Sequence, residues 1–224
     1  MFEAFYASYW QHPILLWVVA VLGLLATLAR TGVHRSVRIA AVVLVVLSFL
    51  DAWLTTSDVP GLGRLGPPFA TVVPLFFVLA GDFRYLLLRE TVGRDGRIRV
   101  TGRGTLRALL WTFVVPVLSQ VVLALVGNDR PRVLFLVYEI GFFLLVLGRM
   151  RWSPVGPTRS KSWVRALDGV ALAWYGTWIT ADIVILGLDA DIGFLLRVVP
   201  NALYYGALPA VLVWGAPRDR VGPG

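Results

Sequence analysis

Several ionisable side chains lie inside long apolar stretches of this sequence, where charge is rarely found. An ionisable group in the core of a bilayer costs at least ~2.5–3.5 kcal/mol on insertion scales, so each is a candidate for a role in function. A buried carboxyl group can take up a proton, bind a cation or serve in a general acid–base pair. The residues concerned are Asp51, Asp82, Arg84, Glu139, Asp168, Asp182 and Arg197.

Other kinds of chemistry find little support in the sequence. There is no cysteine, which excludes disulfides and sulfur-ligated metals. Both histidines, His12 and His34, fall outside the apolar stretches, so a histidine metal site within them is not expected. The basic, glycine-rich stretch 93–104 lacks the Lys-Ser/Thr ending of a phosphate-binding loop. We therefore expect no metal ion and no cofactor. The sequence argues against an enzyme more than for one, but it does not decide the question.

The apolar stretches themselves predict membrane helices. Of the 224 residues, 58% are hydrophobic and 15% are charged, whereas a soluble domain carries about 25% charged residues. A helix needs about 20 mostly apolar residues to cross a bilayer, and seven stretches qualify. The sequence thus predicts an all-α integral membrane protein, a single bundle of seven transmembrane helices over residues 13–214, with a leader at 1–12 and a tail at 215–224. The expected spans are 13–28, 37–56, 67–88, 105–126, 133–148, 166–188 and 192–214.

The distribution of basic residues predicts the orientation of the bundle. Sixteen Lys and Arg residues fall on one side of the membrane, against Arg64, Arg130 and Arg132 on the other. Because cytoplasmic loops carry the excess of positive charge, the N-terminus is expected outside and the C-terminus in the cytoplasm. The expected location of the protein is the cell membrane. The net charge of +8 is explained in this way, and no nucleic-acid partner is expected because no basic helix or stacking platform is visible.

With this orientation, the buried polar residues sort into two layers. At a rise of about 1.5 Å per residue, the outer layer contains Asp51, Glu139, Asp182, Arg197 and Asn201. The inner layer contains Asp82, Arg84 and Asp168. One arginine cannot neutralise three acids, so the surplus carboxyl groups of the outer layer must be neutral or face water. A cavity that takes up a proton or a cation requires this arrangement.

A purely structural interpretation accounts for the same residues. Arg197 would pair with one acid and hold the last span against the second or the sixth. Asp168 would cap the start of the span at 166–188, and Asp82 would pair with Arg84 or Arg89. Single ion pairs inside membranes more often have this role, whereas four charged groups at one level give a structural role and a site about equal support.

The sequence also contains a faint internal repeat. Asp51 and Asp182 each lie near the outer end of an outward-running helix, and a Val-Pro pair, 73–74 or 199–200, follows in the next helix. An arrangement of three helices, one helix and three helices would account for the pattern, as in transporters built from parallel repeats. Chance matching in helices rich in valine and leucine is the alternative.

Two resemblances are limited in extent. The predicted topology resembles that of the rhodopsins, but the only lysine, Lys161, lies in a predicted loop, so no Schiff base to retinal can form in the bundle. Gly81-Asp82 and Ala181-Asp182 resemble the paired-aspartate helices of a family of membrane lysoplasmalogenases. The His-x-x-Tyr element of those enzymes is missing here, and the family is not assigned.

The sequence therefore favours a transport or solute-binding protein linked to a proton or cation, with a polar cavity open to the outside. Its expected partners are the lipid bilayer and a small polar solute or lipid. Two alternatives remain, a membrane-embedded enzyme that acts on a lipid with paired carboxylates, and a non-catalytic scaffold subunit.

Overall fold

The computed structural model describes residues 1–55, 67–93, 95–127, 131–152 and 158–218, and within these ranges it contains helices and no sheet. The all-α prediction is confirmed. Six of the seven expected stretches lie within a helix or a run of short helices, and the second, 37–56, continues past the end of the helix Arg35–Leu54 to Thr56, which lies outside the described residues. The elements are α1 (Phe2–Tyr6), η1 (Trp10–Leu15), α2 (Leu16–Ala29), α3 (Arg35–Leu54), α4 (Pro67–Thr91), α5 (Gly102–Val126), α6 (Pro131–Trp152), α7 (Thr158–Leu188), α8 (Ile192–Leu196), α9 (Val198–Ala202), η3 (Leu203–Ala207) and α10 (Leu208–Trp214).

Six helices in the described part of the chain are long and apolar enough to cross a membrane. They are Trp10–Ala29, Arg35–Leu54, Gly102–Val126, Arg132–Trp152, Lys161–Leu188 and Ile192–Trp214. Their outward faces are apolar, as lipid requires, and Leu22 and Leu118 leave more than half of their surface exposed. The chain is therefore a multi-pass helical membrane protein. The 25-residue helix α4 is not among the six, so the seventh span remains a prediction.

Local signals in the sequence explain where several helices begin and end. The His34 side chain accepts a hydrogen bond from the Ser36 N–H at the start of α3, and Thr101 accepts one from the Gly104 N–H at the start of α5. Such bonds satisfy backbone donors that have no partner inside the helix. Helix α5 ends at Gly127, whose positive φ of 66° is a left-handed conformation that glycine adopts at little cost.

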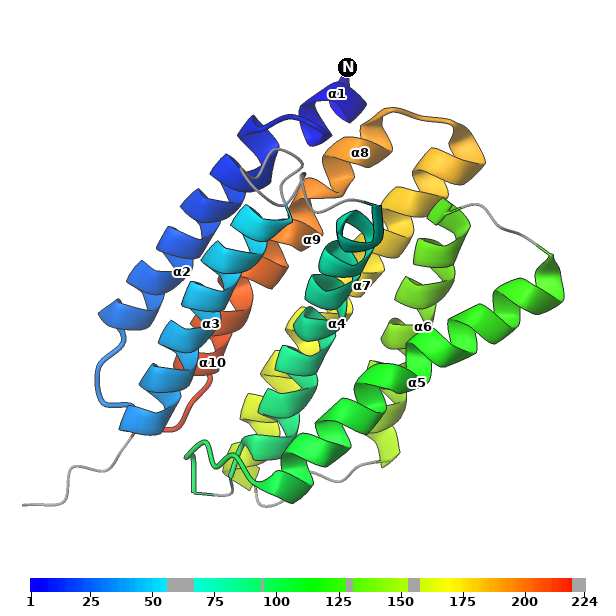
Figure 1. The fold of residues 1–224 in the computed structure, drawn as a ribbon. Helices are drawn as coiled ribbons and strands as arrows, with labels where there is room; N and C mark the ends of the chain where they lie inside the picture. Colours follow the sequence, from blue (N-terminus) through cyan, green and yellow to red (C-terminus); the bar gives the residue numbers. More distant parts are fainter. Residues whose placement is uncertain (56–66, 94, 128–130, 153–157, 219–224) are drawn as a thin grey trace, which may run out of the picture.

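The helices form two groups that lie side by side in Figure 1. Helices α2 and α3 pack with the run α8–α10, and we call these the first group. Helices α4, α5, α6 and α7 form the second group, and α7 also contacts the run α8–α10. In the first group the α2 and η3 backbones approach closely at two glycines. A Cβ atom added to Gly23 would lie 2.8 Å from the Gly206 carbonyl oxygen, so only a residue without a side chain fits there.

The turn between α2 and α3, the loop before α5 and the end of α10 meet at one end of the bundle. The Ile98 N–H donates to the Ser36 hydroxyl (3.1 Å), and Val33 forms a backbone bridge with Arg218. This end, at the bottom of Figure 1, lies opposite α1 and carries most of the basic residues; we call it the basic end. Arg64, Arg94, Arg130 and Arg220 and the side chain of Arg159, all included in the charge count, lie outside the described residues.

Helix α7 begins earlier than the sequence predicts. It starts at Thr158, so Asp168 lies three turns inside the helix and does not cap it, and that interpretation of Asp168 is wrong. The polar residues 158–165 were predicted to form a loop, but they continue the helix beyond its apolar part. The last span is the opposite case, because it is broken into short segments between Ile192 and Trp214.

Candidate functional site

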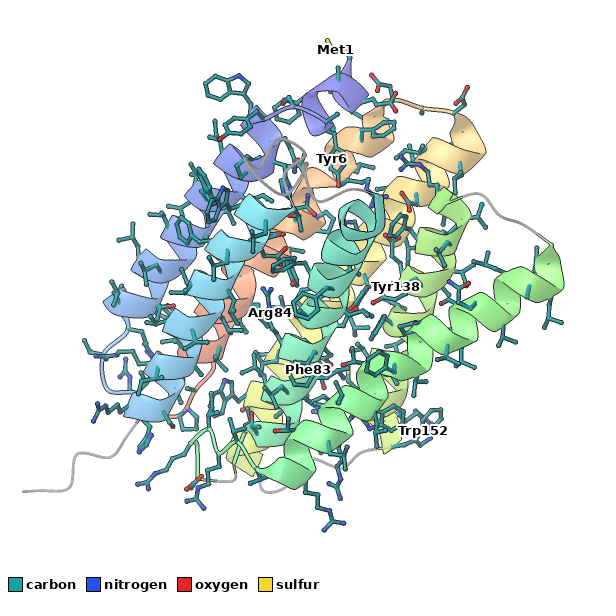
Figure 2. The ribbon with its side chains drawn as sticks, viewed as in Figure 1. Met1, Tyr6, Phe83, Arg84, Tyr138 and Trp152 are labelled. Carbon is teal, nitrogen blue, oxygen red and sulfur yellow. The ribbon has the colours of Figure 1, made fainter. Side chains whose placement is uncertain are left out.

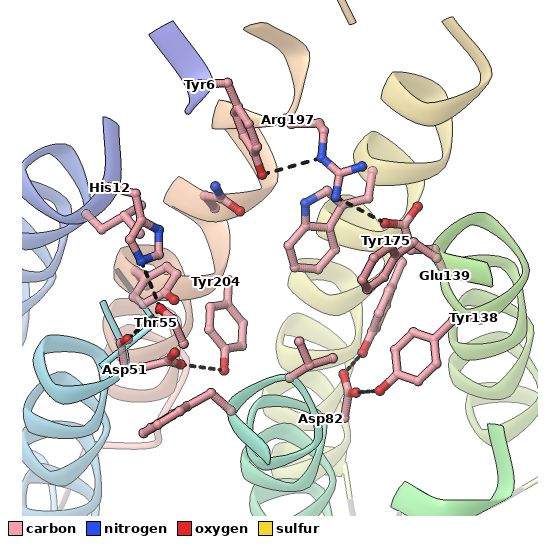
Figure 3. A pocket seen from close by; sticks show the side chains of 17 residues that line it. Tyr6, His12, Asp51, Thr55, Asp82, Tyr138, Glu139, Tyr175, Arg197 and Tyr204 are labelled. Atoms are coloured by element: carbon pink, nitrogen blue, oxygen red, sulfur yellow. Dashed lines mark hydrogen bonds and ion pairs between the residues drawn. The ribbon is translucent and has the colours of Figure 1, made fainter. Parts of the chain in front are cut away.

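A cavity of about 280 Å³ lies between the two groups of helices, in the half of the molecule that faces away from the basic end (Figure 3). Its walls are largely aromatic, and its charged residues come from four different helices or helix breaks. Its polar and charged lining consists of His12, Asp51, Thr55, Asp82, Glu139, Arg197 and Asn201. Its aromatic lining consists of Tyr6, Phe77, Phe135, Tyr138, Tyr175, Trp178, Tyr204 and Tyr205.

Asp82 on α4 is held by two tyrosine hydroxyls and by no cation. The Tyr138 hydroxyl donates to one carboxylate oxygen and the Tyr175 hydroxyl donates to the other, as Figure 3 shows. The residue is 6% exposed. Among the described residues, no lysine, arginine or histidine nitrogen lies within 4.0 Å of its carboxylate. Asp82 is thus a buried acid with hydrogen-bond donors and with no ion pair among the described residues, while the charge of Arg84, two residues further along α4, acts on it at longer range.

Asp51 on α3 differs because it forms an ion pair. Arg84 Nη2 lies 3.0 Å from its Oδ2 atom, and both side chains are buried. The Tyr204 hydroxyl donates to the same oxygen at 3.4 Å, and its ring lies 5.6 Å from the guanidinium carbon of Arg84. A side chain at Gly81 would overlap the Tyr204 hydroxyl. The Asp51–Arg84 pair therefore joins α3 to α4 across the cavity floor and is neutral as a unit.

Two acids and two arginines form a network at the upper wall of the cavity. Arg197, between α8 and α9, donates to Asp182 of α7 and has its Nη2 atom 3.9 Å from Glu139 Oε1 of α6. Arg132 of α6 also reaches Asp182, at 3.3 Å. One oxygen of each acid, Glu139 Oε2 and Asp182 Oδ2, has no partner in the described part of the chain. Four charges therefore balance, and the network is neutral overall.

Among the described residues, the charges around the cavity leave one acid without an ion pair. Four carboxylates, those of Asp51, Asp82, Glu139 and Asp182, face three arginines, and each arginine has a partner other than Asp82. A charge buried in low dielectric must be paired or neutralised. Asp82 therefore needs a proton or a bound cation in addition to its two tyrosines.

The top of the cavity is covered by the first residues of the chain. The Tyr6 hydroxyl accepts a bond from Arg197 Nε (3.4 Å), and the Tyr6 ring lies 5.7 Å from that guanidinium. Helix α1 is held by Asp191, which accepts bonds from the backbone N–H groups of Phe2 and Glu3, each at 2.8 Å. The Met1 ammonium and these two N–H groups lower the pKa of Asp191 to about 2. Helix α1 thus covers the cavity, and an exposed carboxylate anchors it.

His12 contributes a neutral hydrogen bond to the cavity wall. Its Nε2 atom lies 2.8 Å from the Thr55 hydroxyl oxygen, and the Thr55 hydroxyl donates to the Asp51 backbone carbonyl at 2.6 Å. Since a hydroxyl has a single proton, His12 Nε2 must be the donor in this contact. The bond joins the chain before α2 to the end of α3.

The structure divides the predicted site residues differently from the two predicted layers. Asp51, Glu139, Arg197 and Asn201 line one cavity, and Asp182 lies directly behind Arg197. Asp82 lines the same cavity, although the depth estimate placed it in the inner layer. Arg84, predicted as its partner, pairs with Asp51.

Asp168, the third residue of the predicted inner layer, lies apart from the cavity. It accepts bonds from the Tyr85 hydroxyl (2.6 Å) and from Arg89 Nε (3.0 Å). It is 1% exposed, and its contacts join α4 to α7. We therefore assign Asp168 to the packing of the bundle and not to the site.

Sequence reasoning missed Tyr175, Trp178 and His12. A signal for Tyr175 exists, because Asp168, Tyr175 and Asp182 are separated by intervals of seven residues. Seven residues are about two helical turns, so the three side chains share one face of α7. No comparable pattern indicates His12, because its position depends on the irregular backbone of η1, where His12 is extended (φ −134°, ψ 106°).

The described residues contain no group of three or more His, Asp or Glu side chains that could hold a metal ion. Comparisons with models of protein families, with curated proteins and with solved structures gave no match. The function must therefore be argued from the cavity itself.

Proposed function

We propose that this protein binds, and carries across the membrane, a small monovalent cation whose counter-charge is Asp82. The observation that carries the proposal is a carboxylate, Asp82, that has no ion pair among the described residues, in a cavity whose other described charges are paired. Either a proton or a cation would neutralise it, so the two compete for the same group. A proton-linked exchange of a cation follows from that competition.

The aromatic walls favour an organic cation over a metal ion. Tyr175 and Trp178 lie with ring centroids 6.0 Å apart, and Trp178 lies 6.5 Å from Tyr204. The face of an aromatic ring attracts a cation by about 0.5–2 kcal/mol, and several rings around one carboxylate are a recurring design for quaternary ammonium groups. Metal ions of the alkali and alkaline-earth type prefer oxygen ligands in larger number. A volume of about 280 Å³ suits a solute of a few heavy atoms, below the usual range for drug-sized ligands.

The predicted orientation gives this cavity a direction. The basic end would lie in the cytoplasm by the positive-inside rule, so the cavity and α1 would face outward, with the N-terminus outside and α4 as the seventh span. The cell membrane would be the location. The internal repeat remains a prediction, supported only by the fact that its two acids, Asp51 and Asp182, each pair with an arginine.

Binding is tested with choline and with its uncharged analogue 3,3-dimethylbutan-1-ol, which has nearly the same shape. Purified protein in detergent is titrated with each compound while tryptophan fluorescence is recorded, because Trp178 lines the cavity. We expect saturable binding of choline and binding at least about tenfold weaker of the neutral analogue, since tenfold is only 1.4 kcal/mol. Equal binding of the two compounds would overturn the proposal.

The variant that tests the counter-charge is Asp82→Asn, with Asp189→Asn as a matched control. Both remove one carboxylate, but Asp189 is exposed and lies in the turn after α7. Choline binding should be lost in the first variant and unchanged in the second. Uptake of labelled choline into reconstituted vesicles then separates a transporter from a binding protein. A lipid-acting enzyme would instead need Asp82 for turnover of a lipid substrate, and a scaffold would show neither binding nor turnover.

A further inference from the structure

A second cavity lies far from the first, between α5 and α6 near the basic end. Its volume is about 470 Å³, and it is lined by the last turns of α6, the first half of α5 and the end of α4. In Figure 2, Trp152 marks the place where α6 ends, below α5. None of the residues that line the first cavity takes part in it.

Arginine side chains outnumber acids at this cavity. Glu90 of α4 contacts two guanidinium groups, because Arg149 Nη2 donates to one of its oxygens and Arg107 Nη1 lies 3.9 Å from the other. Two positive charges thus share one negative charge. The surplus is positive here, whereas the surplus at the first cavity is negative.

Arg149 retains hydrogen-bonding capacity inside the groove. Its side chain is 9% exposed, and its Nε and Nη1 atoms have no hydrogen-bond partner in the described part of the chain. Its guanidinium carbon lies 4.9 Å from the centroid of the Trp111 ring, so the group is held in place with unused N–H donors. Arg107, with 52% of its side chain exposed, is free to turn toward a ligand.

The surroundings of the groove are those of lipid. Trp152 is 78% exposed and Leu144 is 60% exposed, so apolar side chains flank the arginines on the face that meets the bilayer. Tryptophan is enriched where a helix leaves the hydrocarbon core. Arginine binds phosphate through paired charge-assisted hydrogen bonds, and basic pockets between membrane helices on the cytoplasmic side bind anionic headgroups.

We propose that this groove binds the phosphate group of an anionic phospholipid, with Arg149 and Arg107 as its ligands and the acyl chains along Leu144 and Trp152. The charge surplus, the unused donors of Arg149 and the apolar rim support this assignment together. The proposal does not depend on the function of the first cavity.

The test is native mass spectrometry of the detergent-purified protein with equal amounts of phosphatidylglycerol and phosphatidylcholine. We expect selective retention of phosphatidylglycerol, reduced to the phosphatidylcholine level in Arg107→Gln. This variant leaves the Arg149–Glu90 pair intact, so it should fold. The matched control is Arg151→Gln, an exposed arginine on α6 outside the groove, which should retain the lipid.

Other outcomes are equally decisive. Equal retention of the two lipids, or equal loss in Arg107→Gln and Arg151→Gln, would overturn the proposal in favour of diffuse attraction to basic residues. Saturable binding of inorganic phosphate without lipid retention would show that the groove binds free phosphate and not the headgroup of a phospholipid, and this would overturn the proposal. Glu90→Gln removes the competing carboxylate, and stronger retention of phosphatidylglycerol in that variant would support the assignment.

Discussion

Asp82 and Asp168 are two buried acids between the same pair of helices, and they have different partners. Both accept a hydrogen bond from a tyrosine hydroxyl. Asp168 also contacts Arg89 at 3.0 Å, whereas Asp82 has a second tyrosine in place of a cation. Asp168 is enclosed by packing and Asp82 lines a cavity. An acid with its own arginine joins helices, whereas an acid held by hydroxyls is the one to which we assign the ligand under the proposed function.

The largest expected effect is a difference in protein stability between substitutions at the two acids. Asp168→Asn leaves Arg89 buried without a counter-charge, and breaking a buried pair in this way costs about 3–5 kcal/mol. Asp82→Asn leaves no buried cation and keeps an acceptor for its tyrosines, so its cost should be under about 1.5 kcal/mol. Thermal unfolding in detergent measures both variants.

A double variant provides the control for this difference. Arg89→Leu combined with Asp168→Asn removes the orphaned guanidinium, so it should be more stable than Asp168→Asn alone. If Asp82→Asn unfolds as readily as Asp168→Asn, the distinction between the two acids is wrong.

Substitution of the tyrosines tests the same difference between Asp82 and Asp168, with a smaller expected change in stability. Tyr175→Phe removes one of the two hydroxyl donors to Asp82 in the described part of the chain, and we expect a loss of about 1.5 kcal/mol, the upper end for a hydrogen bond between neutral groups. Tyr85→Phe removes a donor from Asp168, which keeps Arg89, so we expect a loss nearer 1 kcal/mol. Chemical unfolding of the two variants checks the order. The reverse order would indicate that Arg89 contributes little to holding Asp168.

The aromatic surroundings of Asp82 give a smaller effect, on binding alone. Trp178→Leu removes a ring from the cavity wall and should weaken choline binding by about 1 kcal/mol, or roughly fivefold. Binding of 3,3-dimethylbutan-1-ol should change less, because it carries no charge. The ratio of the two affinities, measured by titration, is the observable. An unchanged ratio would mean that the Trp178 ring does not contribute to recognition of the cation.

Asp191 extends the comparison to an acid in water. Its pKa of about 2 lies below its ordinary value of 3.8, so its hold on α1 is complete above pH 4 and is lost as the pH falls toward 2. The protection of the Phe2 and Glu3 amides from hydrogen exchange, taken relative to the intrinsic rate at each pH, should fall over that range. Asp191→Asn should show fast exchange at neutral pH as well. Slow exchange in this variant would mean that packing alone holds α1.

The sequence was sufficient for the helices and for much of the site, because both depend on local pattern. Apolar length identified the six helices that qualify as spans, and the cost of buried charge singled out Asp51, Glu139, Asp182 and Arg197, which lie at or beside one cavity. The estimated depth of a residue along its helix did not predict which residue it pairs with. Arg84 lies two residues after Asp82, about 200° around the helix axis, so it reaches Asp51 on the neighbouring helix instead.

Tertiary context decided the remaining features. Asp82 becomes distinctive only when Tyr138 and Tyr175 approach from α6 and α7, and nothing in the sequence states that these hydroxyls meet. The residues 158–165 look like a loop because they are polar, yet a helix can extend beyond the bilayer without apolar residues.

The close approach of Gly23 and Gly206 has a consequence for motion. A Cβ atom at Gly206 would lie 2.5 Å from Val19 Cγ1 and 2.8 Å from the Val19 carbonyl oxygen, so neither glycine leaves room for a side chain of its own in this contact. Helices in such contact resist sliding, since any displacement must separate main chains that interlock at van der Waals distance. The contact thus fixes η3, which carries Tyr204 and Tyr205 of the cavity wall, against α2. In the proposed transport, the alternation between outward and inward access would come from tilting of α4–α7 against the first group, with the Asp51–Arg84 pair as the link that breaks and reforms.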